Sequence, residues 1–551
     1  MSMTTKQTIE TDVVIIGGGA TGTGIMRDCA LRGIRCILVE KDDIASGTTG
    51  RNHGLLHSGA RYAVTDHESA KECIQENLIL KQIAKHCVEA TEGLFITLPE
   101  DDITFQETFI NACHSAGIAT KQLSAKEALR LEPNVNPALI GAVQVPDGTL
   151  DPFRLCAANV LDAKEHGAQI LNRTIVTGLI RQGDTVLGVH CLQLSTHRQF
   201  NIVAKQVINA AGIWGQNICE YADLNIKMFP AKGSLLILDY RINNLVINRC
   251  RKPSDADILV PGDTISLIGT TSEHIDYDQI DNLHVSEKEV DILLSEGAKL
   301  APIMANTRVL RAYAGVRPLV AVDDDGSGRN ISRGIVLLDH QERDGLKGLT
   351  TITGGKLMTY RLMAEWATDM VAKKLGNTVA CSTHTRPLPG SNQAEKPVKK
   401  TASLAKPVYE SALYRHGERA EQFLSANSKS QAIICECEMV TAGEIEYAIK
   451  QLDVNNLVDL RRRTRLGMGP CQGELCSYRA ASLFQDYGGV SGQQSSQLLV
   501  EFLEERWKGI KPIFWGDALR EAEFSYWIYE GLLGASDLPH PSIQSSQEET
   551  L

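Results

Sequence analysis

Four of the 14 cysteines in this sequence lie close together, at Cys435, Cys437, Cys471 and Cys476. They form two pairs, C-x-C and C-x4-C, and 33 residues separate the pairs. Four thiolates can hold a zinc ion or a [2Fe–2S] cluster. Zinc sites usually use C-x2–4-C pairs, so the C-x-C pair is unusual for zinc. The spacing therefore predicts a metal site and favours iron–sulfur over zinc.

A glycine-rich turn near the start of the sequence has the spacing of a dinucleotide-binding site. Residues 17–22 read G-x-G-x-x-G. Gly17 permits a tight turn, Gly19 lets the backbone approach a pyrophosphate, and Gly22 allows close packing of a helix on a strand. The motif predicts that the following helix begins at a bound phosphate.

The elements around this turn are in the order that such a site requires. A β-branched apolar run over residues 11–16 precedes it, and a helical pattern follows over residues 25–31. A second apolar run over residues 35–40 ends in Glu40, where an acid would bind ribose hydroxyls. The order predicts a β-α-β unit that binds a dinucleotide.

A second glycine motif lies at residues 353–361, TGGKLMTYR. A helix that begins here could place its positive end against a reduced flavin, which carries negative charge. The motif thus predicts further cofactor contacts from Gly354, Gly355, Lys356 and Leu357. The alternative is a simple helix start with glycines at its cap.

Length and composition limit the class of protein. The chain has 551 residues, of which 43% are hydrophobic and 22% charged, which predicts two or three globular domains. Its net charge of −11 argues against a nucleic-acid binder. No apolar run is long enough to span a bilayer, and no secretory signal is apparent. We therefore expect a cytoplasmic protein whose cysteines are mostly reduced.

Further patterns divide the remaining sequence into elements and segments. Strands are expected at residues 203–210 and 348–353, with a long helix at 357–375. A separate sheet should contain strands at residues 234–239 and 264–269. The later segments are a linker at 381–407, the cysteine-bearing module at 430–485 and an aromatic-rich helical segment at 498–533.

Two more motifs, RNHGLLHSGARY at residues 51–62 and YAGVRPL at residues 313–319, carry a family resemblance. With the glycine motifs they resemble the FAD-dependent glycerol-3-phosphate dehydrogenases over residues 10–376. The cysteine-bearing extension is most similar to the large (A) subunits of the anaerobic enzymes. The resemblance implies an α/β fold, α+β overall, like D-amino-acid oxidase: a Rossmann-like FAD domain, an antiparallel-sheet substrate domain and a small helical [2Fe–2S] module. The implied boundaries are about 10–90, 150–215 and 340–376 for the FAD domain, and 91–149 and 216–339 for the substrate domain.

The resemblance also implies an activity. Such enzymes oxidise sn-glycerol 3-phosphate to dihydroxyacetone phosphate by hydride transfer to FAD and pass electrons to quinone. The main rival is one component of a heteromeric FAD-dependent amino-acid or opine oxidase, whose carboxylate substrate would need only one arginine. A flavin-bearing scaffold or redox sensor without a substrate is a third reading.

Site residues follow from matching positions. A phosphomonoester needs cations, and arginine suits bidentate phosphate binding. His57 is the candidate general base, with His53 as its rival and Lys356 as an alternative proton carrier. The resemblance also implies cofactor contacts from Thr49 and Asn52. The positions that match the family's cationic residues are Arg61, Arg317, Arg333 and Lys356.

The cysteine segment resembles the [2Fe–2S] module of bacterioferritin-associated ferredoxin, including residues 463–469. That module often ends in C-x-x-C, whereas four residues separate Cys471 from Cys476, so zinc stays open. The basic run from Arg461 to Arg465 is interpreted as charge compensation for an anionic cluster, or else as a solvated helix face.

Partners are expected because a two-electron flavin must feed quinone through one-electron carriers. The resemblance implies two of them, a second soluble subunit plus a membrane-anchoring iron–sulfur subunit, which would hold this chain at the cytoplasmic face of the inner membrane. An additional FMN in the complex is possible. We expect the aromatic segment to dock on a partner, the alternative being an ordinary core helix. Its aromatic residues are Phe514, Trp515, Phe524, Trp527 and Tyr529.

Overall fold

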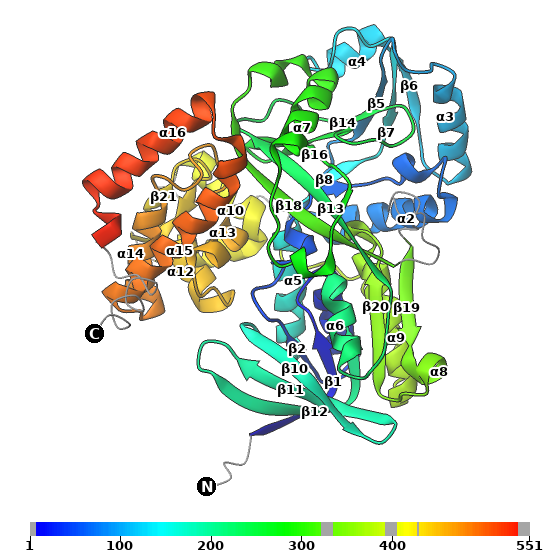
Figure 1. Ribbon diagram of the computed structural model, residues 1–551, viewed down its shortest axis with the longest axis vertical. Helices are drawn as coiled ribbons and strands as arrows, with labels where there is room; N and C mark the ends of the chain where they lie inside the picture. Colours follow the sequence, from blue (N-terminus) through cyan, green and yellow to red (C-terminus); the bar gives the residue numbers. More distant parts are fainter. Residues whose placement is uncertain (1–6, 321–333, 392–404, 427–428, 538–551) are drawn as a thin grey trace.

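The computed structural model describes residues 7–320, 334–391, 405–426 and 429–537 (Figure 1). These residues form a mostly parallel sheet, a larger and mostly antiparallel sheet, and a helical module beside both. Figure 1 shows the helical module at the left, in yellow to red, next to the level where the two sheets meet. The fold class expected from the sequence is confirmed.

The first sheet carries the dinucleotide-type unit. Its strand order is β10-β11-β12-β1-β2-β9, with β20 beside β12 and β19 beside β20. Strands β20, β12, β1, β2 and β9 run parallel to one another. Val13, Val14 and Ile15 are completely buried, as a parallel sheet covered on both faces requires. The strands are β1 (Thr8–Ile16), β2 (Cys36–Val39), β9 (Gln169–Leu171), β10 (Thr174–Gln182), β11 (Thr185–Gln193), β12 (Arg198–Asn209), β19 (Ile335–Asp339) and β20 (Leu349–Gly354).

Three helices pack together on one face of this sheet: α1 (Ala20–Leu31), α5 (Pro152–Glu165) and α9 (Tyr360–Leu375). A glycine lets α1 and α9 approach closely, because a Cβ atom on Gly24 would lie 2.9 Å from the ring of Tyr360. Helix α1 begins at the glycine turn, earlier than the helical pattern of the sequence suggests. Helix α9 is preceded by a 3-10 turn at Leu357–Thr359.

The second sheet has the order β17-β13-β16-β15-β14-β5-β7-β6, with β18 beside β13. Neighbouring strands are antiparallel except β14 and β5. Its longest pair joins β13 to β18, with Ala231 opposite Arg317 and Gly233 opposite Gly315. Helix α7 (Glu287–Leu300) packs against it. The strands are β5 (Gly93–Thr97), β6 (Lys121–Ser124), β7 (Gly141–Val145), β13 (Met228–Leu238), β14 (Val246–Arg249), β15 (Ile258–Gly262), β16 (Ile265–Gly269), β17 (Glu273–His274) and β18 (Val309–Val320).

The helical module has its own hydrophobic core, built on Phe484 and Phe502 among others. Helix α13 contacts α5 of the first unit, and α15 contacts β18 of the second sheet. Its elements are α10 (Lys406–His416), β21 (Ile433–Cys435), β22 (Val440–Thr441), α12 (Ala442–Gln451), α13 (Leu457–Thr464), α14 (Ser477–Gly488), α15 (Gly492–Ile510) and α16 (Gly516–Tyr526).

Two expectations from the sequence concern residues that the structure does not describe. Residues 392–404 of the expected linker lie outside the described residues, and so does Arg333. Within the described ranges, no helix is both long and apolar enough to cross a bilayer.

Candidate functional site

A cavity of about 1230 Å³ lies where the two sheets meet. The predicted residues on its wall come from both glycine motifs, from the end of β2, from residues 46–62 and from β18. Gly22 is an exception, because it packs beneath the turn: a Cβ atom there would lie 1.9 Å from the carbonyl oxygen of Gly17. The predicted residues that line the cavity are Gly17, Gly19, Glu40, Thr49, Asn52, His57, Arg61, Arg317, Gly354, Gly355, Lys356 and Leu357.

The first glycine turn forms a cradle at the end of β1. Gly17 has a φ of +108°, and a Cβ atom on it would lie 2.6 Å from the oxygen of Ala210. Helix α1 begins after Gly19 with no side-chain cap and no acidic residue in its first turn. The positive end of the helix therefore faces the cavity with no acid in its own first turn, as a pyrophosphate site would require.

Glu40 ends β2 beside this turn and is buried. Its carboxylate accepts hydrogen bonds from the backbone N–H groups of Gly18, at 2.6 Å, and Asp42, at 2.8 Å. Burial raises the pKa of Glu40, and the two N–H groups oppose that rise. A polar acceptor is thus held at the position where the sequence predicts ribose binding.

Thr49 and Asn52 shape the loop that borders the turn. The N–H of Ala20 donates to Thr49 Oγ1 at 3.0 Å. The side-chain amide of Asn52 donates to the carbonyl of Thr49 at 2.6 Å, and its Oδ1 accepts from the N–H of Gly54. These bonds hold the loop against the start of α1.

The second glycine motif supplies another part of the wall. Gly354 and Gly355 have φ values of +76° and +65°. A Cβ atom on Gly355 would lie 2.4 Å from the sulfur of Met363. The N–H of Lys356 donates to Thr359 Oγ1, which closes the 3-10 turn before α9. The glycines are therefore required by both backbone conformation and space, and the turn brings backbone groups to the cavity.

Arg317 reaches the cavity from β18. Its guanidinium donates to the backbone carbonyls of Lys232, at 3.2 Å, and Thr271, at 3.0 Å, and to the hydroxyl of Thr270, at 2.5 Å. A Cβ atom on Gly233 would lie 2.6 Å from Nη2 of Arg317, so the facing strand leaves room for the side chain. Arg317 is thus held in a fixed orientation by neutral oxygen atoms.

The other predicted catalytic side chains gather around Tyr62. Lys356 Nζ lies 4.7 Å from the centre of the Tyr62 ring, and the His57 ring packs edge-on against it at 5.5 Å. The ring centres of His53 and His57 lie 6.1 Å apart. Arg61 donates to the carbonyl of Ser254 at 3.1 Å. The structure therefore brings both histidines, Lys356 and Arg61 to one side of the cavity.

Some lining residues were not singled out from the sequence. Ala211 and Gly212 follow β12, which lies parallel to β1, so their turn sits beside the first glycine turn. A small-residue turn after a buried strand is the signal that could have identified them. Thr270 and Thr271 carry no such signal, because their role follows from contact with Arg317.

The four cysteines form one continuous group. The Cys435 thiol contacts Cys476, Cys476 contacts Cys471, and Cys471 contacts Cys437. Hydrogen bonds from Cys437 and Cys476, and then from backbone N–H groups, lower the pKa of Cys471. Close backbone packing holds the group, since a Cβ atom on Gly469 would lie 2.4 Å from Cβ of Cys437.

The geometry of this group bears on what it can hold. Among the described residues, no three His, Cys, Asp or Glu side chains are arranged around a single metal ion. A [2Fe–2S] cluster does not need that arrangement, because two irons share the four thiolates. Backbone N–H groups of Glu438 and Gly467 point at Cys435, and hydrogen bonds of this kind stabilise cluster sulfur atoms. The donor set therefore fits a [2Fe–2S] cluster.

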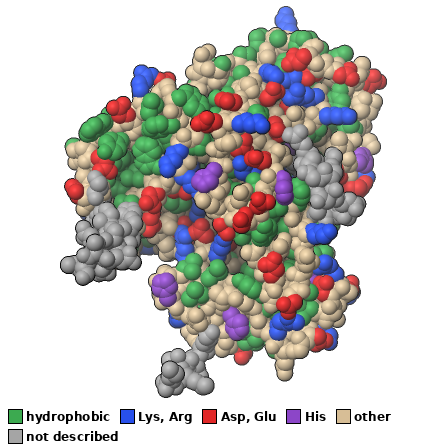
Figure 2. All heavy atoms as spheres, in the orientation of Figure 1, with side chains coloured by type: hydrophobic (Ala, Val, Ile, Leu, Met, Phe, Trp, Pro, Cys, Tyr) green, Lys and Arg blue, Asp and Glu red, His purple; other side chains and the backbone are tan. Residues whose placement is uncertain are grey.

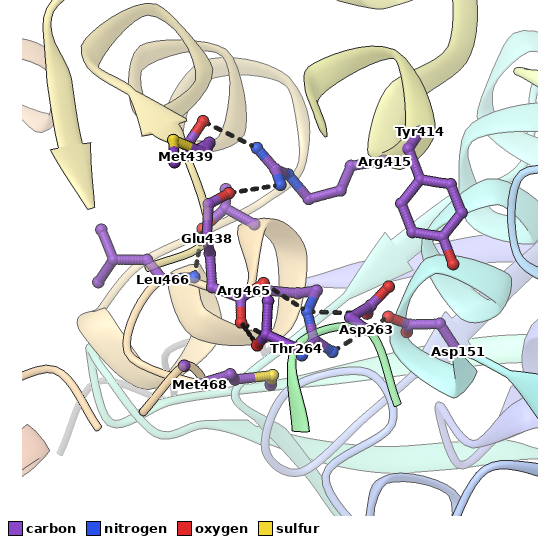
Figure 3. A network of polar contacts seen from close by, with 12 residues as sticks. Asp151, Asp263, Thr264, Tyr414, Arg415, Glu438, Met439, Arg465, Leu466 and Met468 are labelled. Atoms are coloured by element: carbon purple, nitrogen blue, oxygen red, sulfur yellow. Dashed lines mark hydrogen bonds and ion pairs between the residues drawn. The ribbon is translucent and has the colours of Figure 1, made fainter. Parts of the chain in front are cut away.

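The solvated-face interpretation of the basic run is wrong for Arg462, Arg463 and Arg465, while charge compensation for a cluster stays a prediction. Each of these side chains is mostly buried and pairs with carboxylates where the module meets the rest of the protein. Figure 3 shows Arg465 between Glu438, at 3.0 Å, and Asp263, at 2.9 Å. The run joins the module to both sheet regions, a long-range role that sequence spacing does not reveal.

The aromatic segment is divided between surface and core. Phe514, Trp515, Phe524 and Trp527 are 46–61% exposed, and Figure 2 shows hydrophobic side chains gathered over α16. Tyr529 is buried, and its hydroxyl donates to the carbonyl of Glu474, between two of the cysteines. Most of the segment is therefore not an ordinary core helix. We call Phe514, Trp515, Phe524 and Trp527 the aromatic surface.

Comparisons with known proteins agree with this arrangement. A family model described as FAD dependent oxidoreductase matches residues 12–361, and one described as BFD-like [2Fe-2S] binding domain matches residues 433–486. The glycerol-3-phosphate dehydrogenase from Bacillus halodurans, solved in complex with FAD, superposes with a TM-score of 0.65 at 22% identity. That match covers 92% of this chain and 97% of the other, and it supports the fold.

Sequence relatives are much closer. The large (A) subunit of the anaerobic glycerol-3-phosphate dehydrogenase from Escherichia coli K12 is 66% identical over 97% of this chain and 98% of the relative. The protein of the same name from Haemophilus influenzae is 61% identical over 98% of this chain and 96% of the relative. The chain therefore belongs to the family of large (A) subunits of anaerobic glycerol-3-phosphate dehydrogenases, FAD-dependent oxidoreductases that carry a BFD-like [2Fe–2S] binding domain.

Proposed function

We propose that this chain oxidises sn-glycerol 3-phosphate to dihydroxyacetone phosphate and passes the electrons through its cysteine module to partner subunits and quinone. One observation carries the proposal: the predicted cations Arg61, Arg317 and Lys356 and both candidate histidines line the same cavity as two glycine turns suited to a dinucleotide. The relatives' names supply the substrate. A heteromeric amino-acid or opine oxidase would leave several of these cations without a role.

The cofactor would be held by groups already positioned. The start of α1 would bind the pyrophosphate, Glu40 the ribose, and the turn at Gly354 and Gly355 the flavin edge. When bound, FAD supplies the acceptor for the hydride that leaves C2 of the substrate.

The substrate phosphate would be held by Arg317, Arg61 and Lys356. Arg317 is already oriented by neutral oxygens, so little rotational freedom is lost when it binds an anion. Its planar fork can make two parallel hydrogen bonds to phosphate, whereas Lys356 acts as a point charge.

The C2 hydroxyl proton needs an acceptor as the hydride leaves. His57 is our candidate for this base because it lines the cavity close to Tyr62 and Lys356. A histidine has an ordinary pKa near neutrality and can accept a proton at physiological pH. His53, which also lines the cavity, is the rival base, and Lys356 would stabilise the developing alkoxide.

The four cysteines would hold a [2Fe–2S] cluster, which carries electrons one at a time. Metal analysis of purified protein separates this from zinc: about two iron atoms per chain support the cluster, and one zinc opposes it. Chromatography of acid-released flavin would at the same time tell FAD from any FMN.

We infer that electrons leave the chain beside the aromatic surface. Ser525 on α16 and Tyr529 in the turn after it both hydrogen-bond Glu474, so this region, which carries the aromatic surface, packs against the segment between Cys471 and Cys476. Exposed aromatic patches are typical of protein interfaces. A partner that docks here would be close to the cluster and could link this chain to the membrane.

An anaerobic visible spectrum tests the central proposal. Glycerol 3-phosphate should bleach the flavin band at about 450 nm in FAD-loaded protein and leave iron–sulfur absorbance as a shoulder. Bleaching by an amino acid or opine, with glycerol 3-phosphate inert, would favour the rival oxidase. Bleaching by none of these would point to the scaffold or sensor reading.

A further inference from the structure

A second cavity, of about 790 Å³, lies where the cysteine module meets both sheet regions. It shares the wall segment Arg51–His53 with the first cavity. On the module side it is lined by Arg461, Gly467 and Gln472, the last directly after Cys471. A molecule bound here would lie between the proposed flavin site and the cysteine group.

Three of the six arginines that line this cavity lie close to carboxylates. Arg154 lies 2.9 Å from Asp151 and 3.0 Å from Asp263. Arg465 lies 2.9 Å from Asp263, and Figure 3 shows these acids beside it. Arg462 pairs with Asp43, at 3.2 Å. These side chains need no further anion.

Arg311 and Arg461 are different. Within the described part of the chain, both approach only the carboxylate of Glu505, and at 3.6 Å and 3.9 Å neither contact is a hydrogen bond. The Nε atoms of both side chains are buried and have no hydrogen-bond partner among the described residues. Arg461 is 9% exposed and lines the cavity. The two guanidiniums thus share one carboxylate, that of Glu505, which is too far from either of them for a hydrogen bond.

A third guanidinium adds positive charge near Glu505. Arg51, on the shared wall, lies in the field of the same Glu505 carboxylate and of Arg311. Burial, and then repulsion from Arg311, lowers the pKa of Arg461 to about 9. These three guanidiniums share the Glu505 carboxylate, and because Lys508 and Lys511 line the cavity along with Glu287 and Glu504, positive charge stays in excess there. Such a group is costly to bury unless an anion completes it.

We propose that the second cavity binds an organic anion that carries a phosphate group, with the phosphate held by Arg311 and Arg461. A phosphate monoester carries close to two negative charges, which suits this excess of positive charge, and guanidinium pairs bind it bidentately. The remaining cavity wall includes Tyr313, Trp507 and Leu283, which suits a partly apolar molecule.

This site is separate from the proposed substrate site. Arg311 and Arg461 line the second cavity and not the first, whereas Arg61, Arg317 and Lys356 line the first and not the second. The proposal therefore stands whether or not glycerol 3-phosphate is the substrate.

Calorimetric titration of FAD-loaded full-length protein with inorganic pyrophosphate tests the proposal. An Arg317→Gln variant is titrated in parallel, because it weakens the proposed substrate site and leaves the second cavity unchanged. We expect one pyrophosphate per chain in both proteins and about tenfold weaker binding for each of Arg311→Gln and Arg461→Gln. Arg308→Gln is the matched control, because Arg308 pairs with Asp239 and Glu521 at the same interface.

A variant that should bind pyrophosphate more tightly is also needed, because a misfolded variant can lose binding for an unrelated reason. Glu505→Gln removes the competing carboxylate, so pyrophosphate should bind several-fold more tightly than to the wild-type protein. No binding to the wild-type protein at millimolar pyrophosphate would overturn the proposal. It would also be overturned by binding that Arg317→Gln abolishes while Arg311→Gln and Arg461→Gln leave it unchanged.

Discussion

Arg463 and Asp43 form a bidentate ion pair although they lie 420 positions apart in the chain. Nη2 lies 2.6 Å from Oδ1 and Nη1 lies 3.0 Å from Oδ2, and both side chains are 1% exposed. Asp43 follows the dinucleotide-type unit, and Arg463 lies on the helix before Cys471. The pair therefore joins the flavin region directly to the cysteine module.

Breaking this pair should loosen the module. Arg463→Met leaves the buried Asp43 carboxylate with Arg462 as its remaining cation, at 3.2 Å, which should lower the free energy of unfolding by about 1–3 kcal/mol. Urea denaturation would measure the loss. Asp43→Asn combined with Arg463→Met should cost less than Arg463→Met alone. Arg181→Met, which breaks an exposed pair with Asp223, is the control and should change little. An equal effect of Arg181→Met and Arg463→Met would contradict this role.

Arg317→Gln should weaken substrate binding and leave cofactor binding unchanged. We expect kcat/KM for glycerol 3-phosphate to fall by about 100-fold or more, because a charge-assisted phosphate contact is lost. FAD content should not change. Arg35→Gln, at an exposed pair with Asp12, is the matched control. Steady-state kinetics with an artificial acceptor would measure the effect, and unchanged kinetics would remove Arg317 from the phosphate site.

Cys476→Ser should remove the cluster and spare the flavin. Loss of one thiolate of four should lower the iron content well below the wild-type value, while glycerol 3-phosphate still bleaches FAD. Cys381→Ser is the control, since Cys381 bonds to Thr383 and lies outside the cysteine group. Iron analysis and anaerobic spectra give the readout. Full iron content in the Cys476→Ser variant would show that Cys476 is not a ligand of the cluster.

The aromatic surface should be needed for partner binding. Trp527 is 61% exposed, so Trp527→Ser should preserve folding and reduce co-purification with the partner subunits. Trp366→Ser removes an exposed tryptophan from α9 instead and should have no effect. Co-purification of co-expressed subunits provides the measurement. Equal recovery with both variants would place the docking surface elsewhere.

Acid should destabilise the protein through His86. Burial, and then repulsion from Arg154, lowers the pKa of His86 to about 3, whereas an unfolded histidine titrates near 6.5. The neutral form therefore stabilises the fold above pH 6.5, and this contribution is lost as the pH falls from 6.5 towards 3. Between pH 6.5 and pH 5 His86 should lower the free energy of unfolding by about 2 kcal/mol. Urea denaturation of the His86→Gln variant should show a smaller fall in the free energy of unfolding over that pH range. An equal fall in both proteins would refute the role of His86.

Local motifs predict the parts of the site that depend on backbone conformation. Gly17 and Gly355 were identified from spacing because a positive φ and a close approach leave a glycine signature. Arg317 was identified through a family motif. The position of the cysteine module could not be predicted, because it rests on pairs such as Arg463–Asp43 between distant segments. The separation of Tyr529 from its exposed aromatic neighbours also depends on tertiary contacts that periodicity does not encode.

The place of β20 in the first sheet has a consequence for synthesis of the chain. This strand lies beside β12 and leads into the second glycine motif, so the wall of the first cavity is incomplete until residue 363 has left the ribosome. The cysteines emerge later, when a finished flavin region is already available for docking. Helix α16 comes after the cysteines in the chain and packs over the segment between Cys471 and Cys476, where Ser525 donates to Glu474, so this helix covers the cysteine group only after all four thiols have been made.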